Sequence, residues 1–386
     1  MIRIILLTDF SEEYAKNLLK GIAQYSKGRG SWVLCKMPLS YRDVYEVEGV
    51  LEWALKWKAD CIIAQFYNTD RVSIFRENGI IAIAQDFKQR FTEILNITGA
   101  HYHAGQMGAN YFIKKGFKNF AFYGFKGVVW SEERCEGFRD EIEKHGWSKN
   151  FSEYQNIEFK DLWFYESAPL TEWLQMLPKP VAIMACDDNQ GHHIIEACNQ
   201  SGIKIPEEVA VLGVDNDEAV CTLSYPPLSS IHQAVEKGGY ETAELIEKMI
   251  KDPDAAYEDV IVHPTHIVTR QSTDIYATDD KSISVILKYI HQNTDKKLNV
   301  NDLLKLVPLS RRLLETRFRE VTGLSVYSYI LNLRIQKFAE KLIYSKDTVV
   351  EIAMKMGFTD YKNISRQFKA IKGCTPSEYR LKRSVK

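Results

Sequence analysis

Short apolar runs alternate with longer stretches of helical periodicity over roughly the first 270 residues. Several runs are hydrophobic at consecutive positions, which is typical of strands in a parallel sheet that helices cover on both faces. Strand-helix alternation over this length predicts a doubly wound α/β structure with parallel sheets. The expected strands are Ile2–Leu7, Cys61–Gln65, Ile80–Ala84, Asn119–Tyr123, Val181–Ala185, Ala210–Val214 and Ser230–His232. The expected helices are Tyr14–Ser26, Val50–Lys56, His103–Lys115, Glu132–Lys144, Asn189–Ser201 and Ala234–Lys251, and helix ends are expected at Gly79, Gly116, Gly146 and Gly202.

The last hundred residues or so contain one hydrophobic pattern twice, without a gap between the aligned copies. Each copy predicts a helix, a tight turn, a second helix and a glycine stop, which together form a helix-turn-helix. A tandem pair of these motifs in an all-α domain indicates DNA binding. The matching positions are Val300 and Val350, Leu314 and Ile364, Phe318 and Phe368, Gly323 and Gly373, and Tyr329 and Tyr379.

We predict the first helix-turn-helix over 299–321 and the second over 349–372. A helix over Ile283–Gln292 is expected before the motifs, and a longer helix over Ser328–Ile343 is expected to join them. The first motif has a support helix Asn301–Val307, a turn at Pro308 and Leu309, and a recognition helix Arg311–Val321 capped by Ser310. The second has a support helix Val349–Met356, a turn at Gly357 and Phe358, and a recognition helix Tyr361–Lys372 capped by Asp360.

One stripe of each recognition helix is apolar and the other is polar. The apolar stripes, which are expected to face inward, are Leu314, Phe318 and Val321 in the first helix and Ile364, Phe368 and Ile371 in the second. Early residues of such a helix reach base edges, where Arg can pair with guanine and Glu can accept from cytosine. Later residues, such as Arg319 and Lys369, are expected at phosphates. The candidate DNA-binding residues are Arg311, Arg312, Glu315, Thr316, Tyr361, Lys362 and Arg366.

The charge is distributed unevenly along the chain, although its net value is only −1. Residues 281–386 carry 22 Lys and Arg and 9 Asp and Glu, a net charge of +13, so residues 1–280 carry −14. A basic block joined to an acidic body is typical of a nucleic-acid-binding module. The alternative, a merely solvated basic surface, does not explain why the charge coincides with the repeat.

The remaining composition excludes several classes of protein. No apolar run is long enough to span a membrane, and seven cysteines without a CxxC pair fit a reduced, cytosolic protein. No Walker loop, GxSxG, GxGxxG after a strand or HExxH indicates an enzyme. The histidine pairs are poorly spaced for a metal, and Asp215, Asp217 and Glu218 lack the rest of an EF-hand loop. We therefore predict no enzymatic activity, no cofactor and no metal.

The second repeat copy resembles the AraC-type family of bacterial transcription factors. The likeness rests on Ile352, Ala353, Gly357, Phe358, Phe368, Lys369, Gly373, Thr375, Pro376 and Tyr379. The first copy departs from the family pattern, because Pro308 replaces the usual turn glycine and Leu304 the usual alanine. The resemblance covers about the last hundred residues and implies DNA binding.

The first part of the chain resembles the periplasmic-binding-protein fold of lactose-repressor-type regulators, which bind small sugars between two lobes. The segments MACDDNQGHH, VLGVDNDE and WSEERCEGF carry the likeness and imply that Asp188, Asp215 and Arg134 contact the sugar. Strand-end carboxylates can accept from neighbouring hydroxyls, and Trp130 could pack on a sugar face. Alternatively, such aspartates cap helices and Trp130 belongs to the core. The candidate ligand residues are Asp9, Tyr14, Trp130, Arg134, Asp188, Asp215 and Gln233.

The combination of the two parts is similar to bacterial activators of pentose catabolism. It implies a sugar-responsive regulator with D-xylose as the favoured effector; the alternative is the same architecture with arabinose or another sugar. Domains are expected at 1–274 and 283–386 with a linker at 275–282. Expected partners are operator DNA, a second copy of the chain and RNA polymerase, in the cytoplasm at the nucleoid. One departure, Ala100 where relatives often carry an acidic residue, falls in the sugar-binding part.

Overall fold

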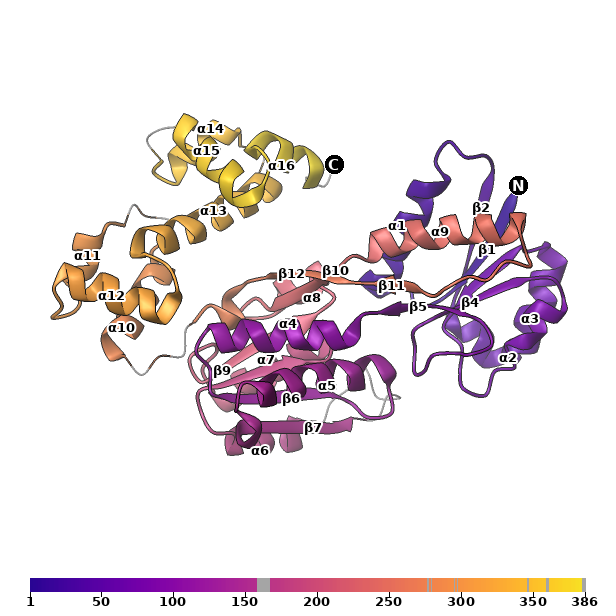
Figure 1. Cartoon of the computed structure of the whole chain (residues 1–386), viewed down its shortest axis with the longest axis horizontal. Helices are drawn as coiled ribbons and strands as arrows, with labels where there is room; N and C mark the ends of the chain where they lie inside the picture. The colour runs from indigo at the N-terminus through magenta and orange to yellow at the C-terminus, as the bar shows by residue number, and fades with distance from the viewer. Residues whose placement is uncertain are drawn as a thin grey trace. The chain divides into compact units, whose positions relative to one another are not determined.

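The computed structural model describes residues 1–157, 167–275, 278, 280–294, 296, 298–345, 347–358 and 361–383. The chain divides into two compact units. The first comprises Met1–Ile113 with Lys118–Thr273, and the second comprises Lys114–Phe117 with Asp274–Lys386. The first unit contains two α/β lobes and the second consists of helices (Figure 1), which confirms the predicted fold class.

The N-lobe is built on a six-stranded parallel sheet with the order β11-β5-β4-β3-β1-β2. Helices α1 and α9 bury side chains such as Leu18 and Ile246 on one face, and α2 and α3 bury Val50 and Phe75 on the other. The strands are β1 Ile2–Leu7, β2 Trp32–Met37, β3 Cys61–Ala64, β4 Ile81–Gln85, β5 Leu95–Gly99 and β11 Val260–Val262. The helices are α1 Glu13–Ser26, α2 Leu39–Trp57, α3 Ser73–Glu77 and α9 Val235–Lys251.

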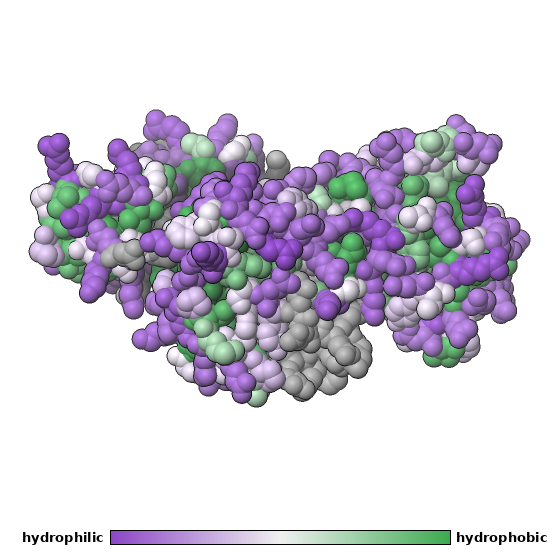
Figure 2. Space-filling model, turned by 60° about the horizontal axis from the view of Figure 1, so that its bottom comes forward, coloured by the Kyte–Doolittle hydropathy of each residue, from purple (hydrophilic) through white to green (hydrophobic). Residues whose placement is uncertain are grey.

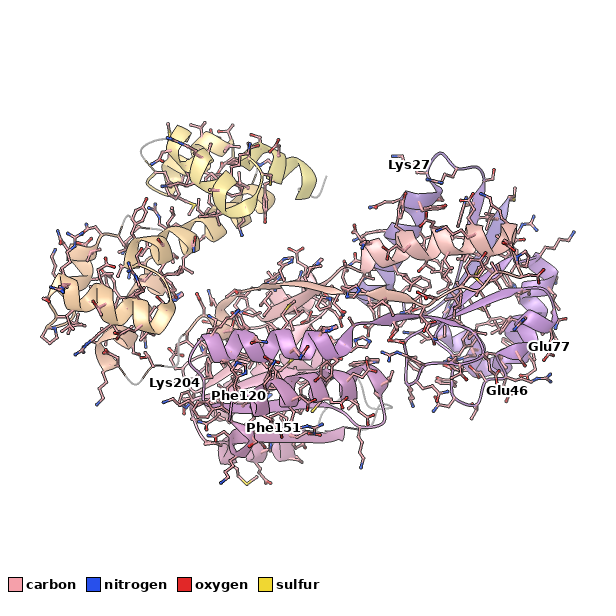
Figure 3. The ribbon with its side chains drawn as sticks, in the orientation of Figure 1. Lys27, Glu46, Glu77, Phe120, Phe151 and Lys204 are labelled. Atoms are coloured by element: carbon pink, nitrogen blue, oxygen red, sulfur yellow. The ribbon has the colours of Figure 1, made fainter. Side chains whose placement is uncertain are left out.

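The C-lobe sheet has the order β12-β10-β9-β8-β6-β7, and only β12 runs antiparallel to its neighbour. Phe120 and Phe151, labelled in Figure 3, are register partners on β6 and β7. The strands are β6 Asn119–Phe125, β7 Phe151–Ile157, β8 Val181–Ala185, β9 Val209–Val214, β10 Ser229–Gln233 and β12 Pro264–Val268. The helices are α4 His101–Lys114, α5 Val129–Lys144, α6 Ser167–Met176, α7 Asp188–Ser201 and α8 Glu218–Leu223. The chain crosses between the lobes after β5, after β10 and after β11.

The predicted strands are all present, with bounds within two residues of those expected. The strands that the sequence did not predict are β2, β5, β7, β11 and β12, of which all but β5 lie at a sheet edge. An edge strand is covered less completely, so it lacks the continuous apolar run of a central parallel strand. The four glycines expected at helix ends do adopt positive φ, between 72° and 84°. Helix α2 is longer than predicted and is interrupted at Glu46, where φ is 57°.

The second unit consists of helices around two separate hydrophobic cores. One core contains Leu314 and Phe318, the other contains Ile364 and Phe368, and α13 contributes to both. Ser310 caps α12 as predicted, and its hydroxyl accepts from the Leu313 N–H. The helices are α10 Lys281–Gln292, α11 Val300–Leu304, α12 Arg311–Thr322, α13 Val326–Tyr344, α14 Val349–Lys355, α15 Tyr361–Lys372 and α16 Pro376–Arg383.

Two predictions for this unit need comment. Ile371 was expected to face inward, but its side chain is 39% exposed, because the second core ends at Phe368 on this helix. The expected cap Asp360 lies outside the described residues. Hydrophilic residues predominate on the face drawn in Figure 2. Within the described ranges, no helix combines the length and apolar character needed to cross a membrane.

Candidate ligand site and nucleic-acid interface

Helix α5, which carries Trp130 and Arg134, is held against α4 by direct backbone contact. A Cβ atom on Gly137 would lie 2.0 Å from the Tyr102 carbonyl oxygen, and one on Gly105 would lie 2.1 Å from that of Arg134. Only glycine allows this approach, because any side chain would force the helices apart. The packing therefore fixes the position of Arg134 relative to the first residues of α4.

Buried Arg134 and Gln233 and partly buried Asp215 form a cluster at the strand ends of the C-lobe. The Arg134 side chain is 3% exposed; it donates to the Cys186 carbonyl and, at 3.4 Å, to Asp215 Oδ1. The Gln233 amide also donates to Asp215 Oδ1. Asp215 directly follows β9 and has a φ of 98°, an unusual conformation for a residue with a side chain. Strained backbone of this kind concentrates at functional sites, and the structure brings these three predicted residues together.

Two adjacent carboxylates at the start of α7 occupy different environments. Asp188 is 2% exposed, and its Oδ2 atom accepts from the backbone N–H of Asp217 at 2.6 Å. Burial raises the pKa of the Asp188 carboxyl well above its usual value. Asp187, which the sequence reasoning did not single out, is half-buried and caps the helix through the Gln190 N–H. Burial raises the pKa of Asp187 to about 6. Asp187 is therefore the more accessible of the pair.

The loop after β1 carries Glu12 and the first turn of α1 carries Tyr14, and both lie within electrostatic range of these C-lobe residues. Burial raises the pKa of Tyr14; the charges of Asp86 and Asp215 raise it further and that of Arg134 lowers it, so the phenol lies within electrostatic range of both lobes. Glu12 was not predicted as a site residue. Its side chain keeps access to solvent. Desolvation by neighbouring atoms, followed by the charges of Asp187 and Asp215, raises its pKa to about 8.

Asp9 lies in the same loop but is engaged locally. Its Oδ1 atom accepts from both the backbone N–H and the hydroxyl of Ser11, at 2.8 and 2.7 Å. The side chain is exposed. Asp9 therefore shapes the loop that carries Glu12 and leads into α1, where Tyr14 lies.

Several buried polar atoms around this junction have no hydrogen-bond partner within the described part of the chain. Such atoms are normally paired, because leaving them unpaired in the interior is costly. Several of them lie near the carboxyl ends of the strands, where open α/β sheets bind ligands, so a bound molecule could supply partners there. The atoms are Thr8 Oγ1, Tyr14 OH, Gln85 Oε1, Asp86 Oδ1, His101 Nδ1, Arg134 Nε, Asp188 Oδ1 and Gln233 Oε1.

The loop after β4 contacts the start of α5 across the two lobes, and we call this contact the latch. The Trp130 indole N–H donates to the Phe87 carbonyl at 2.8 Å, and the Val129 N–H donates to the Lys88 carbonyl at 2.9 Å. Arg90 and Glu133 form a two-pronged ion pair, with N···O distances of 2.6 and 2.7 Å. Trp130 therefore holds the lobes together, and the Arg134 guanidinium lies 5.2 Å from its ring centre.

The predicted DNA-binding residues on α12 lie on its exposed side. Arg311, Arg312 and Thr316 are exposed, whereas Glu315 is half-buried and accepts from the Val326 N–H at 3.4 Å. On α15, Arg366 is exposed. The side chains of Tyr361 and Lys362 lie outside the described residues, although both belong to the helix.

A groove of about 680 Å³ lies between the two helix-turn-helix motifs. Arg311 and Glu315 of α12 line it together with Asn363 and Gln367 of α15. Gln367 donates to the hydroxyl of Tyr327, which lies on the connecting helix α13, at 3.0 Å. The sequence reasoning missed Asn363 and Gln367. Their uncharged amides gave no contrast with the rest of the polar stripe.

Comparisons with known proteins cover both units. Residues 109–273 match the family described as "Periplasmic binding protein-like domain", and residues 303–382 match "Helix-turn-helix domain". The "Xylose operon regulatory protein" of Escherichia coli (strain K12) is 26% identical over 390 residues, which cover 98% of this chain and 96% of that protein. The protein of the same name from Haemophilus influenzae is 26% identical and covers 98% of each chain. The solved "structure of xylose-binding transcription activator xylR" is 25% identical, with a TM-score of 0.65, over 99% of this chain and 98% of that chain.

Proposed function

We propose that this chain activates pentose catabolic genes in response to D-xylose. The chain is a transcription regulator that joins a periplasmic binding protein-like domain to an AraC-type helix-turn-helix domain. The observation that carries this proposal is the likeness to xylose regulators along nearly the whole chain, including both units. Its relatives are regulators and not enzymes. The likeness favours xylose over arabinose or another sugar.

The charge of the ligand site supports an uncharged sugar. Asp86, Asp187 and Asp215 bring carboxylates to the junction of the lobes. Among the described residues, Arg134 contacts Asp215 at 3.4 Å, and Arg90 lies 4.0 Å from Asp86. An excess of carboxylates accepts well from sugar hydroxyls, whereas it repels a phosphate or a sugar acid. The charge balance therefore supports an uncharged sugar, such as free D-xylose, over a phosphorylated or oxidised pentose.

We assign ligand contacts to Tyr14, Arg134, Asp215 and Gln233, with Asp187 at the position that the resemblance gave to Asp188. The unpaired atoms of Tyr14, Arg134 and Gln233 support this assignment. Asp188 supports the loop at Asp217 from within the lobe. The sequence also suggested Asp9 and Trp130. We give Asp9 a supporting role through Ser11, and Trp130 a role in closing the lobes over the sugar.

In this mechanism sugar binding stabilises the latched arrangement of residues 1–274 and, through a linker at 275–282, changes how residues 283–386 meet DNA. The division of the chain after Thr273 supports these limits. Arg311, Arg312, Thr316, Arg366, Tyr361 and Lys362 would contact operator DNA, with Glu315 positioning the first recognition helix. The protein would act as a dimer beside RNA polymerase, in the cytoplasm at the nucleoid.

Calorimetric titration of the full chain tests the effector. The sugars are D-xylose, L-arabinose, D-ribose and D-glucose, with D-xylose 5-phosphate as the charged comparison. We expect saturable binding of D-xylose and none of the phosphate. In parallel, D-xylose should change the affinity for DNA from the region upstream of xylose genes. Binding of another sugar in place of xylose would redirect the effector assignment. Unchanged DNA affinity at saturating sugar would contradict regulation.

A further inference from the structure

We propose that Asp274 and His291 form a joint through which sugar binding controls the first helix-turn-helix. The inference rests on the proposed function, because it describes how the ligand-binding unit of the same regulator passes its state to the DNA-binding unit. Asp274 directly follows Thr273, the last residue of the first unit, and opens the main segment of the second unit. A displacement at the end of the ligand-binding unit therefore reaches Asp274 first.

Asp274 lies directly against a helix of the DNA-binding unit. Its Oδ2 atom is 2.5 Å from Nδ1 of His291, which lies near the end of α10. The Asp274 side chain is 25% exposed and the His291 side chain 14%, so the contact is largely shielded from solvent. Such shielding strengthens the attraction between a carboxylate and an imidazole. The joint thus connects the chain after Thr273 to α10 in addition to the covalent linker.

His291 is itself held by the core of the first helix-turn-helix. Its Nε2 atom lies 2.7 Å from the hydroxyl of Tyr329, which belongs to α13. The Tyr329 ring is buried and meets the Phe318 ring edge-on, at a centroid distance of 5.3 Å. Phe318 is a buried residue of α12, the predicted recognition helix. Asp274 is therefore connected to α12 through the side chains of His291 and Tyr329.

Helix α10 is fixed to α12 at its other end as well. The Asp280 carboxylate caps the first turn of α10, and its Oδ2 atom pairs with Arg317 of α12 at 3.4 Å. Between the two ends, Ile286 and Ile290 of α10 are fully buried in the core that contains the apolar side of α12. A displacement at His291 should therefore move α10 and α12 together.

On the ligand side, the segment that leads into the joint is tied to the sugar-binding end of the C-lobe. Thr273 is fully buried, and its hydroxyl donates to that of Ser229 at 2.7 Å. Arg270 donates to Asn216 Oδ1 at 2.9 Å. Asn216 directly follows Asp215, a proposed sugar contact, and both have positive φ, 54° and 98°. A sugar that shifts this strained backbone would displace the segment through Arg270.

Helix α4 reaches the same segment from the crossover between the lobes. The helix starts where the chain passes from the N-lobe to the C-lobe after β5. Near its other end, the Tyr111 hydroxyl lies 2.7 Å from that of Thr273. Just after the helix, Lys115 donates to the Ile275 carbonyl at 3.5 Å. Closure of the lobes would therefore move the residues on both sides of Asp274.

The joint gives the two states of the regulator different restraints on α10. In the sugar-bound state Asp274 stays on His291 and the first helix-turn-helix is held for DNA. In the sugar-free state the contact is lost and the linker alone connects the units. Sugar then strengthens operator binding, and operator DNA must strengthen sugar binding by the same factor, because such coupling is reciprocal.

Matched substitutions in the full chain test the joint. Asp274→Asn removes the charge and keeps the size of the side chain. His291→Gln keeps a polar group but removes the ring that bridges Asp274 and Tyr329. Asp254→Asn and His263→Gln are the controls, because they make the same changes at exposed positions of the first unit. Thermal unfolding checks that each variant is folded. If His291→Gln does not fold, Asp274→Asn alone still decides the question.

Two measurements give the coupling independently. Fluorescence anisotropy follows binding to a duplex from the region upstream of xylose genes with and without D-xylose, and calorimetry follows D-xylose binding with and without that duplex. In the unaltered chain and in both controls, each ligand should strengthen binding of the other by about five- to 150-fold.

Asp274→Asn and His291→Gln should each reduce this factor to less than about twofold, while D-xylose binding without DNA stays within about twofold of the unaltered chain. The double variant should lose no more coupling than either single variant, because each single change already breaks the same contact.

The possible failures can be told apart. If D-xylose leaves DNA binding by the unaltered chain unchanged, the proposed function is wrong, and the joint falls with it. If the unaltered chain responds to sugar and both variants respond equally, the joint is wrong while the proposed function stands. If the variants lose D-xylose binding itself, the two residues support the ligand-binding unit, and the joint is again wrong.

Discussion

Arg134 combines three tasks in one side chain, because a guanidinium offers donors in a fixed plane. One nitrogen donates to the Cys186 carbonyl, a second donates to Asp215, and the third has no partner among the residues described. A lysine would keep the charge but could not reach these directions at once. The shape of the group therefore matters more than its charge.

We predict that Arg134→Lys lowers the free energy of unfolding by about 1–3 kcal/mol, since it leaves buried acceptors unpaired. It should also weaken D-xylose binding by at least about tenfold. Chemical denaturation and calorimetry measure the two effects. Arg139→Lys is a suitable control, because Arg139 pairs with Glu153 at the surface. Wild-type affinity in Arg134→Lys would remove this residue from the ligand site.

The raised pKa of Glu12 predicts that the stability of the folded protein depends on pH. Its pKa in the folded protein is about 8 against a usual value near 4.5, so between these pH values the folded state holds a proton that the unfolded state has released. Stability then falls as pH rises through this window. In Glu12→Gln the decline should be smaller, and above pH 8 this variant should be the more stable protein. Thermal unfolding from pH 5 to 9 measures it. Parallel curves for the two proteins would contradict the prediction.

The sequence predicted a ligand region but could not rank adjacent residues within it. Asp187 and Asp188 are chemically identical in the sequence. They differ only because Asp187 caps α7 while Asp188 turns into the lobe toward the Asp217 N–H. Arg134 and Asp215 were predicted from motif resemblance and Gln233 from its place after a strand, and the structure brings the three together.

The latch joins the loop after β4 to the start of α5, and it is connected to the proposed sugar contacts. Arg90 donates to the Thr98 hydroxyl at 2.7 Å, and Thr98 donates to Asp86. The charge of Asp86 also acts on Tyr14, a proposed sugar contact, so a sugar bound there would order the loop that carries Arg90. This gives closure of the lobes a physical route from the ligand.

We predict that Arg90→Gln and Glu133→Gln each weaken D-xylose binding by about three- to tenfold, because the latched state becomes less populated. The double variant should lose less than the product of the single effects, since each single change already breaks the same ion pair. Calorimetry on the four proteins gives the coupling. Strictly additive effects would show that Arg90 and Glu133 act independently.

Among the strands and helices, the sequence best predicted those with buried apolar residues. Central strands such as β3 and β8 are apolar throughout, so their pattern was clear. Edge strand β2 has only one fully buried residue, Met37, and β12 has none. The tandem helices were predicted well because caps and glycine stops repeat along with the core residues. The prediction that Ile371 faces inward was wrong, because the repeat preserves a hydrophobic residue at this position but the second core does not extend to it.

The molecule as a whole separates opposite charges along its length. Residues 1–280 carry a net charge of −14 and residues 281–386 carry +13. The acidic part has no favourable electrostatic interaction with DNA phosphates, whereas the basic part releases counterions when it binds them. The salt dependence of DNA binding should therefore report on the C-terminal residues alone.

We predict that Arg319→Gln and Lys369→Gln, which remove exposed charges late in α12 and α15, each reduce the slope of log affinity against log salt by about one. Arg366→Gln should instead relax sequence preference, since an early helix residue reaches base edges. Lys27→Gln, an exposed lysine of the N-lobe (Figure 3), provides the matched control with an unchanged slope. Fluorescence anisotropy with operator and scrambled duplexes measures both quantities. If Lys27→Gln changed the slope as much as Lys369→Gln, the phosphate contacts would have to be reassigned to the acidic body of the chain.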